Sequence, residues 1–195
     1  MVCADYVITV PENRNHTSRL DPRQPLVIDT RELSRRPGSQ RKVAFQAPAP
    51  VDLGVGMIGV PPGARIDLSL RLESVMEGVL VSGTVTGPLA GECGRCLEPI
   101  TSDIEVDLQE LYAYPGSETT EDEAGRMDGD YLDLEPALRD AVVLALPLTP
   151  LCRADCGGLC VVCGARRDDV DCGHEEAPVD PRWAALNDLT VSDEE

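Results

Sequence analysis

Two cysteine pairs in this 195-residue chain have the spacing Cys-x-x-Cys, namely Cys93 with Cys96 and Cys160 with Cys163. Two intervening residues let both sulfur atoms face one ion at a Zn–S distance of about 2.3 Å, in a turn whose backbone amides also point towards sulfur. Each pair has a glycine beside one of its cysteines, which gives the turn the backbone freedom that it needs. The spacing therefore predicts metal binding.

Four more ligand-type residues follow in the second half of the chain, in Cys152-x-x-x-Cys156 and in Cys172-Gly173-His174. With Cys3 set aside, seven cysteines and His174 make eight ligands, which is the number that two tetrahedral ions need. We predict two structural zinc ions, the first bound by Cys93, Cys96, Cys152 and Cys156, and the second bound by Cys160, Cys163, Cys172 and His174. The grouping leaves open that Cys152 or Cys156 is a bystander.

Other uses of these cysteines fit less well. Disulfides are not expected in a chain without an export signal, and a redox Cys-x-x-Cys normally opens a helix, whereas Cys93 follows a predicted strand. An iron–sulfur cluster has compatible spacing, but a histidine beside three cysteines suits zinc better. Catalytic zinc usually keeps one open position, and four ligands for each ion leave none. His16 lies in a polar stretch, and we expect it to be solvated.

The elements that must position these ligands follow from the apolar pattern. Apolar residues alternate from Ile66 to Leu72, which predicts a strand over 66–73. A turn at Glu77-Gly78 leads to strands at 80–86, ended by Gly87-Pro88, and at 101–114. One helix is predicted over 134–146, with Pro147 ending it and with one apolar face made of Leu134, Leu138, Val142 and Ala145. The predicted fold class is α+β, mainly an antiparallel β-meander with one main helix and a C-terminal zinc knuckle.

The remaining segments have weaker patterns. Short strands are predicted at 25–28 and 43–46, a helical turn at 31–36, a mobile acidic loop at 116–130 and a short helix that docks Trp183 at 181–189. The predicted domains are a disordered N-terminal extension (1–24), a β-rich domain with its closing helix (25–150), and a cysteine-rich metal-binding segment with an acidic tail (151–195).

The formal net charge of −18 is unevenly distributed along the chain. Residues 1–42 carry eight of the 17 basic residues and five of the 35 acidic ones, so the remainder has a net charge of −21. Such a body repels nucleic acid phosphates and suits a basic protein partner, although acidity also simply keeps a protein soluble. No apolar run approaches the roughly 20 residues that span a bilayer, and we predict a cytoplasmic protein without a membrane partner.

No catalytic constellation emerges from the sequence. There is no glycine-rich phosphate loop and no nucleophile motif, and the chain has only two histidines. We therefore predict that the protein is not an enzyme and has no small-molecule substrate.

The cysteine-bearing segments resemble the YceD family, the large ribosomal RNA subunit accumulation proteins of bacteria and plastids. The likeness lies in Cys93-Gly94-Arg95-Cys96-Leu97-Glu98-Pro99, in the helix end Leu144-Ala145-Leu146-Pro147-Leu148, and in Leu151-Cys152 and Asp155-Cys156 through Cys163-Gly164. It runs from about Pro25 to Leu189. Where many members end in Cys-x-Cys, this chain has Cys172-Gly173-His174, which keeps a zinc ligand. Some relatives keep the first ligand set and lack the second, in agreement with the grouping above.

The resemblance implies a non-catalytic factor that supports the accumulation of large-subunit (23S) ribosomal RNA during ribosome assembly. In many bacteria the family's gene neighbours one for a small basic ribosomal protein, so the expected partner is a ribosomal protein or the pre-50S particle. A second hypothesis is direct binding of ribosomal RNA through the basic N-terminal stretch, made of Arg31, Arg35, Arg36, Arg41 and Lys42, which could equally be a solvated loop. A third hypothesis is that the protein is a zinc-dependent hydrolase.

Overall fold

The computed structural model describes residues 20–33, 35–117, 124–174 and 182. The chain forms two compact units, one made of Met1–Ala90 and Thr101–Leu148, and the other made of Gly91–Ile100 and Thr149–Glu195. The extension predicted at 1–24 lies outside the described residues except for 20–24, and the predicted helix at 181–189 lies outside them except for Arg182. The domain boundaries predicted from the sequence stay a prediction.

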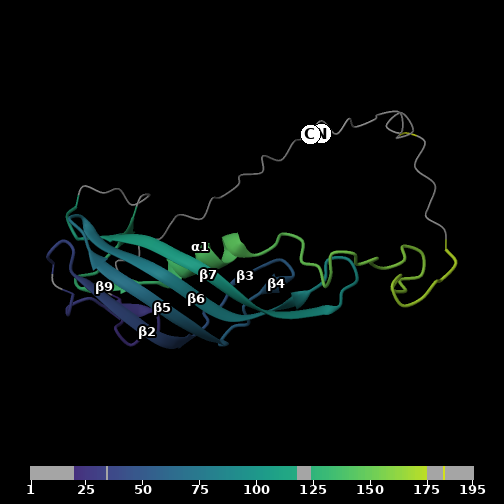
Figure 1. The fold of residues 1–195 in the computed structure, drawn as a ribbon, viewed down its shortest axis with the longest axis horizontal. Helices are drawn as coiled ribbons and strands as arrows, with labels where there is room; N and C mark the ends of the chain where they lie inside the picture. The colour runs from purple at the N-terminus through teal and green to yellow at the C-terminus, as the bar shows by residue number, and fades with distance from the viewer. Residues whose placement is uncertain (1–19, 34, 118–123, 175–181, 183–195) are drawn as a thin grey trace, which may run out of the picture. The chain divides into compact units, whose positions relative to one another are not determined.

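A seven-stranded, mostly antiparallel sheet dominates the first unit (Figure 1). Its strands are β2 (Gln40–Pro48), β3 (Gly54–Val55), β4 (Ile58–Gly59), β5 (Arg65–Ser74), β6 (Gly78–Glu92), β7 (Pro99–Ala113) and β8 (Gly125–Arg126). The strand order is β2-β5-β6-β4-β3, and β7 pairs with β6 and β8. The predicted meander is confirmed, since β5, β6 and β7 pair consecutively.

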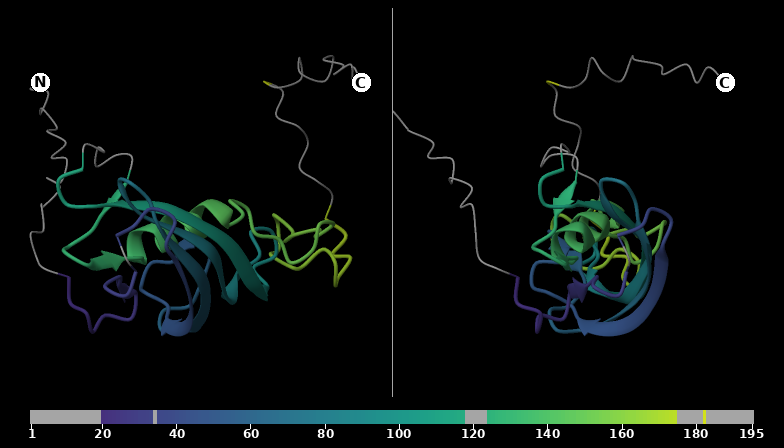
Figure 2. Two further views of the ribbon diagram at one scale, coloured as in Figure 1. Left: turned by 60° about the vertical axis from the view of Figure 1, so that its left-hand side comes forward. Right: turned by 90° about the vertical axis from the view of Figure 1, so that its left-hand side faces the viewer.

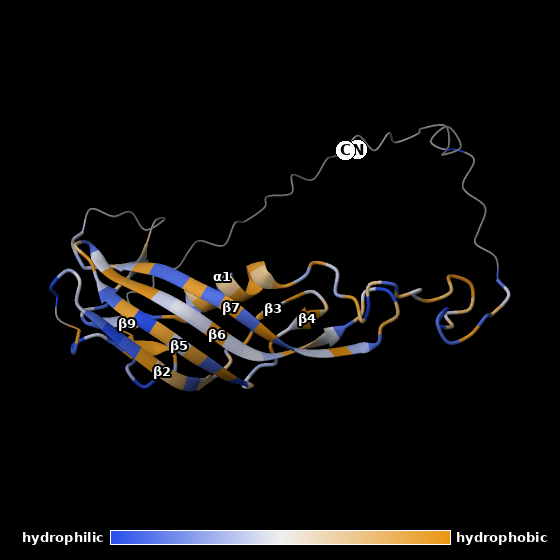
Figure 3. Ribbon diagram, in the orientation of Figure 1, coloured by the Kyte–Doolittle hydropathy of each residue, from blue (hydrophilic) through white to orange (hydrophobic). Residues whose placement is uncertain are grey.

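The alternation of apolar and polar residues explains why one face of β5 is buried in the core. Ile66, Leu68, Leu70 and Leu72 are at most 3% exposed, while the residues between them face solvent. The antiparallel register with β2 places Val43 opposite Leu70 and Phe45 opposite Leu68, so that both strands turn their apolar side chains to the same face. The resulting stripes of apolar and polar residues are visible in Figure 3.

The predicted end of β6 at Gly87-Pro88 is wrong, because the strand continues to Glu92. Proline interrupts a strand by removing a hydrogen-bond donor from the ladder. The ladder between β5 and β6 has already ended at the pair Asp67 and Thr86, so Pro88 removes no donor from that ladder.

Helix α1 (Glu135–Ala145) confirms the one predicted helix. Leu138 and Val142 are buried, and Figure 2 shows the helix within the curve of the sheet. Ala145 is exposed, contrary to prediction, and the buried residue at this end is Leu146. Leu146 has the extended angles φ −71° and ψ 139°, because the following proline disfavours the helical conformation.

Two N-terminal predictions have different outcomes. The strand predicted near residues 25–28 is β1 (Val27–Asp29), which forms a separate antiparallel pair with β9 (Tyr131–Asp133). The helical turn predicted at 31–36 is wrong for the described residues, which form hydrogen-bonded turns such as Leu33 N–H to the Thr30 carbonyl at 2.8 Å.

The acidic segment at 116–130, predicted as a loop, contains ordered structure at its C-terminal end. Its β8 pairs in parallel with the end of β7, and Ala124 and Met127 are only 5% and 7% exposed. The prediction missed these two anchors because single apolar residues within an acidic run give no periodic signal. No helix in the described part of the chain is long and apolar enough to cross a membrane.

Candidate metal centres

The first candidate centre begins in the turn that joins β6 to β7. Cys93 N–H donates to the Glu98 carbonyl at 2.8 Å, and Leu97 N–H donates to the Cys93 carbonyl at 3.0 Å. Leu97 has a positive φ of 60°, which closes the turn. These bonds hold Cys93 and Cys96 on the same side of a tight loop. Cys152 and Cys156 come from the segment that starts at Thr149 in the same unit.

The four sulfur atoms have the spacing of a tetrahedral thiolate site. Cys93 Sγ lies 3.9 Å from Cys156 Sγ, and Cys96 Sγ lies 3.6 Å from Cys152 Sγ. All four lie within 4.8 Å of one another. Four sulfurs at about 2.3 Å from one zinc ion are about 3.8 Å apart, whereas a disulfide needs about 2.05 Å. The seven described cysteines are free, so the arrangement fits a metal ion and not a pair of disulfides.

Burial gives this set the character of a structural site. Cys93, Cys96 and Cys156 are at most 4% exposed and pack with Ile100, Leu151 and Leu159 in a small apolar core. Cys152 alone is exposed. Three of the four cysteines of the first set therefore belong to a buried core.

Backbone amides prepare Cys93 for the thiolate form. Arg95 N–H lies 3.5 Å from Cys93 Sγ. The pKa of Cys93 falls to about 6, because a backbone hydrogen bond from Cys152 outweighs burial and the amides of Arg95 and Cys96 add to it. A metal ion binds the thiolate, so this environment favours binding.

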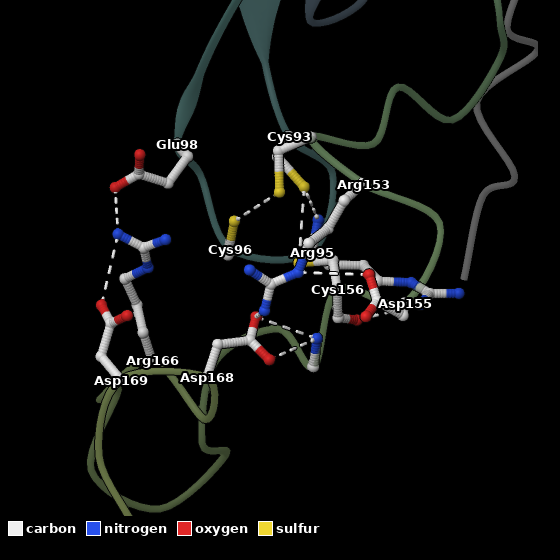
Figure 4. Close-up of polar contacts among 12 residues, drawn as sticks. Cys93, Arg95, Cys96, Glu98, Arg153, Asp155, Cys156, Arg166, Asp168 and Asp169 are labelled. Carbon is white, nitrogen blue, oxygen red and sulfur yellow. Dashed lines mark hydrogen bonds and ion pairs between the residues drawn. The ribbon is translucent and has the colours of Figure 1, made fainter.

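Charged side chains surround the first set (Figure 4). Arg95 donates to the Cys156 carbonyl at 3.0 Å. Asp168 accepts from Gly157 N–H at 3.1 Å and pairs with Arg153 at 2.6 Å. Arg166 pairs with Glu98 and, at 3.4 Å, with Asp169. These contacts fix the loop after Cys163 against both cysteine turns of the first set.

The second set gathers Cys160, Cys163, Cys172 and His174, whose ligand atoms also lie within 4.8 Å of one another. His174 Nδ1 is 3.8 Å from Cys160 Sγ. Cys160 N–H donates to the Ala165 carbonyl at 2.7 Å, and backbone hydrogen bonds from Cys163 and then Val162 lower the pKa of Cys160 to about 6. The turn that holds Cys160 and Cys163 therefore has the same backbone hydrogen-bond pattern as the turn that holds Cys93 and Cys96.

The second set is much more open than the first. Cys160 is buried, Cys172 is half-buried, and both Cys163 and His174 are exposed. The structure therefore gathers the eight ligand-type residues in the two groups of four that the sequence predicts. Their binding of zinc stays a prediction.

Comparison with known proteins gives a family. Residues 81–190, which include all eight ligand-type residues, match the family model described as large ribosomal RNA subunit accumulation protein YceD. The chain belongs to the YceD family. An uncharacterized protein of Mycobacterium tuberculosis (strain H37Rv) is 46% identical over 169 residues, covering 85% of this chain and 81% of that protein. An uncharacterized protein of Mycobacterium leprae is 42% identical over 173 residues, covering 87% and 79%. No solved structure matches.

The five basic residues predicted to bind RNA differ in their ion-pair partners in this YceD protein. Arg31 pairs with Asp29 and stacks on Tyr131 at 5.5 Å, and Arg35 pairs with Asp130 at 2.8 Å. Arg41 pairs with Glu32 at 3.1 Å. Arg36 and Lys42 are exposed. A carboxylate therefore neutralises three of the five.

Sequence reasoning missed Arg166 and Asp168, which connect the loops of the first set. Each is an ordinary charged residue in a polar stretch, so spacing alone carries no signal for either. The one signal in the sequence for these two residues is that both lie in a charged segment between the predicted ligands Cys163 and Cys172.

Proposed function

We propose that this protein is a non-catalytic ribosome-biogenesis factor that supports the accumulation of 23S ribosomal RNA by binding a basic ribosomal protein, free or on the pre-50S particle. Membership of the YceD family supports the link to the large subunit, since the family is named for it. The observation that carries the mode of action is a row of carboxylates without ion-pair partners on β7.

The row consists of Asp103, Glu105 and Asp107, all exposed on one face of β7. None of the three has an ion-pair or hydrogen-bond partner among the described residues. Alternate residues of a strand are spaced by about 6.8 Å, so the row presents three negative charges over about 14 Å. Val106 and Leu108, on the opposite face, are 5% and 3% exposed and fix the orientation of the strand.

Such a row suits a partner with several lysines or arginines. Opposite charges steer association and select partners, while like charges exclude nucleic acid phosphates. The net charge of −21 outside residues 1–42 acts in the same direction. A basic ribosomal protein fits both the charge and the family.

We propose that the two ligand sets hold structural zinc. Zinc there would supply cross-links between chain segments in a unit with few apolar residues. Four ligands of the right kind in each set leave no position for a substrate or a reactive water, which supports a scaffold over a zinc-dependent hydrolase.

Direct binding of ribosomal RNA is the second candidate function. Arg36 and Lys42 are the residues of the basic stretch that would serve it best, because both are exposed. The carboxylate partners of Arg31, Arg35 and Arg41 reduce the attraction that those residues offer to phosphate.

Crosslinking and mass spectrometry on nuclease-treated cells would test the proposal. We expect a basic ribosomal protein to remain bound to the wild type and to be lost from D103N/E105Q/D107N. The matched control is D52N/E77Q/D140N, which removes three other exposed carboxylates and should keep the partner. Loss of every partner after nuclease treatment, or equal binding by both triple variants, would refute the acidic docking row.

A further inference from the structure

A hollow of about 410 Å³ lies on the solvent face of the main sheet, over strands β2, β5 and β6. Lys42 and Arg71 line it, and no carboxylate of the described residues does. Two other hollows of the same unit differ, since one contains Asp29 and Glu32 and the other contains Asp130. In a chain with a net charge of −18, two cations without an acidic residue between them indicate a place for an anion.

The two cations lie directly opposite each other in the sheet. The antiparallel register pairs Lys42 on β2 with Arg71 on β5, and it pairs Arg71 with Ser82 on β6. Leu70 and Leu72, the neighbours of Arg71, are buried, so Arg71 and the residues opposite it face solvent. Like charges in opposite positions destabilise a sheet. An anion bound between the two side chains would remove that repulsion.

Most of the hydrogen-bond donors around the hollow are free. Lys42, Ser69 and Ser82 have no hydrogen-bond or ion-pair partner among the described residues. Arg71 pairs with Glu73 through Nη2, but its guanidinium has several N–H donors and that contact uses only part of them. An ammonium, a guanidinium and two hydroxyls together form a donor set that suits phosphate oxygens, and the charged donors make the strongest hydrogen bonds of the set.

The floor of the hollow is made of small residues. Ala44 lies directly opposite Ser69, and Gly83 lies opposite Leu70. Gly83 has a φ of 153°, and a Cβ there would lie only 2.1 Å from the Ser69 carbonyl oxygen, so the close approach of β5 and β6 requires glycine at this position. No long side chain therefore fills the space beside the two cations, and the exposed Ser69 hydroxyl is open to a ligand.

The size and surroundings of the hollow favour a small ligand over a nucleic acid. Its volume is that of a small-molecule site, so a phosphate group can occupy the donor set and leave room for the group that carries it. The carboxylate row Asp103, Glu105 and Asp107 lies on the same solvent face, on β7 beside β6, and would repel a long polyanion. The row is two strands from Arg71, roughly 10 Å away or more, a distance at which salt screens its charges from a small ligand. No aromatic side chain of the described residues lines the hollow, so nucleic acid bases would have nothing on which to stack.

We propose that this hollow binds the phosphate group of a small phosphate monoester. Lys42 and Arg71 pair with the charge of the phosphate, and the hydroxyls of Ser69 and Ser82 donate hydrogen bonds to its oxygens. The hollow belongs to the first unit, whereas both cysteine sets belong to the second. The proposal therefore depends neither on bound metal nor on the proposed ribosomal partner.

NMR titration of the full-length protein tests the site, with inorganic phosphate and ribose 5-phosphate added separately at constant ionic strength. Both should saturably shift the backbone amide resonances of residues 42–44, 69–71 and 82–83, and ribose 5-phosphate should bind more tightly because the hollow also holds part of its sugar. K42Q/R71Q should weaken the binding of ribose 5-phosphate at least about tenfold, because it removes both charged donors. S69A/S82A should weaken it about two- to tenfold.

The matched control is R36Q/R65Q, which removes two other exposed arginines and should bind ribose 5-phosphate as wild type does. Urea denaturation should give both double variants the stability of wild type, since Lys42 and Arg71 are exposed. Wild-type protein without saturable shifts, or equal weakening by K42Q/R71Q and R36Q/R65Q, would refute the site. Tighter binding of inorganic phosphate, or of a single-stranded RNA at these same residues, would overturn the assignment to a small phosphate monoester.

Discussion

The Sγ atoms of Cys96 and Cys152 lie 3.6 Å apart, although 56 positions separate the two residues in the chain. The same relationship links Cys93 and Cys156 at 3.9 Å over 63 positions. Thiols held this close without a disulfide repel one another as they ionise, and a shared cation removes that repulsion. In the second unit the buried cysteines Cys93, Cys96 and Cys156 form one cluster, against which Ile100, Leu151 and Leu159 pack.

Replacement of a ligand in the second set should remove one metal ion. We expect wild-type protein to contain two zinc ions per chain and Cys160→Ser to contain one, with faster hydrogen exchange over residues 157–174. Binding at such a site contributes about 10 kcal/mol or more to folding. Elemental analysis and hydrogen exchange check the prediction. Cys3→Ser is the control and should match wild type; a Cys160→Ser protein with two ions would contradict the assignment.

The two sets should release metal in a fixed order. The second set exposes Cys163 and His174, whereas three of the four ligands of the first set are buried, so a chelator reaches the second ion first. We expect two separate phases of release, with the imidazole-containing site emptied in the first phase. Spectra of the cobalt-loaded protein would follow both sites. Simultaneous release, or early loss from the four-thiolate site, would contradict this order.

Helix α1 offers a matched pair of leucines for testing the core of the first unit. Leu138 is completely buried and Leu144 is 85% exposed on the same helix. Leu138→Ala should destabilise the protein by about 2–5 kcal/mol, because it leaves a cavity under the helix. Leu144→Ala should change the free energy of unfolding by no more than about 0.5 kcal/mol. Urea denaturation measures both, and similar values for the two variants would show that the helix does not pack as described.

Asp168 should stabilise the loop that follows Cys156 in a pH-dependent way. Burial raises the pKa of Asp168, but hydrogen bonds from Gly157 N–H and the ion pair with Arg153 outweigh it, so the folded-state pKa lies below the ordinary value. A lowered pKa means that the stabilisation is complete above about pH 4 and disappears as the pH falls through the folded-state value.

Hydrogen exchange at Gly157 measures this effect. Asp168→Asn should increase the exchange rate of the Gly157 amide about tenfold at neutral pH, since a hydrogen bond to a charged acceptor is replaced by a weaker one. Asp155→Asn is the control, because that carboxylate is 86% exposed and its ion pair with Arg153 is weak. An equal response of Gly157 to both variants would rule out the specific role of Asp168.

Local patterns predicted the parts of the fold that depend on neighbouring residues. Strand β5 follows from alternation between Ile66 and Leu72, and helix α1 follows from its apolar face and from Pro147. Other features depended on partners distant in the chain. Strand β6 continues past Pro88, beyond the end of its ladder with β5, and it also pairs with β7. Ala124 and Met127 are buried although they belong to an acidic run.

For the candidate site, the sequence by itself determined which residue types are available and which local turns they form, because a Cys-x-x-Cys turn needs only its own backbone. The sequence also predicted the two groups of four ligands, but only the tertiary structure placed the ligand atoms of each group within 4.8 Å of one another and decided how much of each set is exposed to solvent. Those properties depend on contacts such as that between Arg166 and Glu98, 68 positions apart. Such contacts join residues that are far apart in the chain, so they form only when the chain folds.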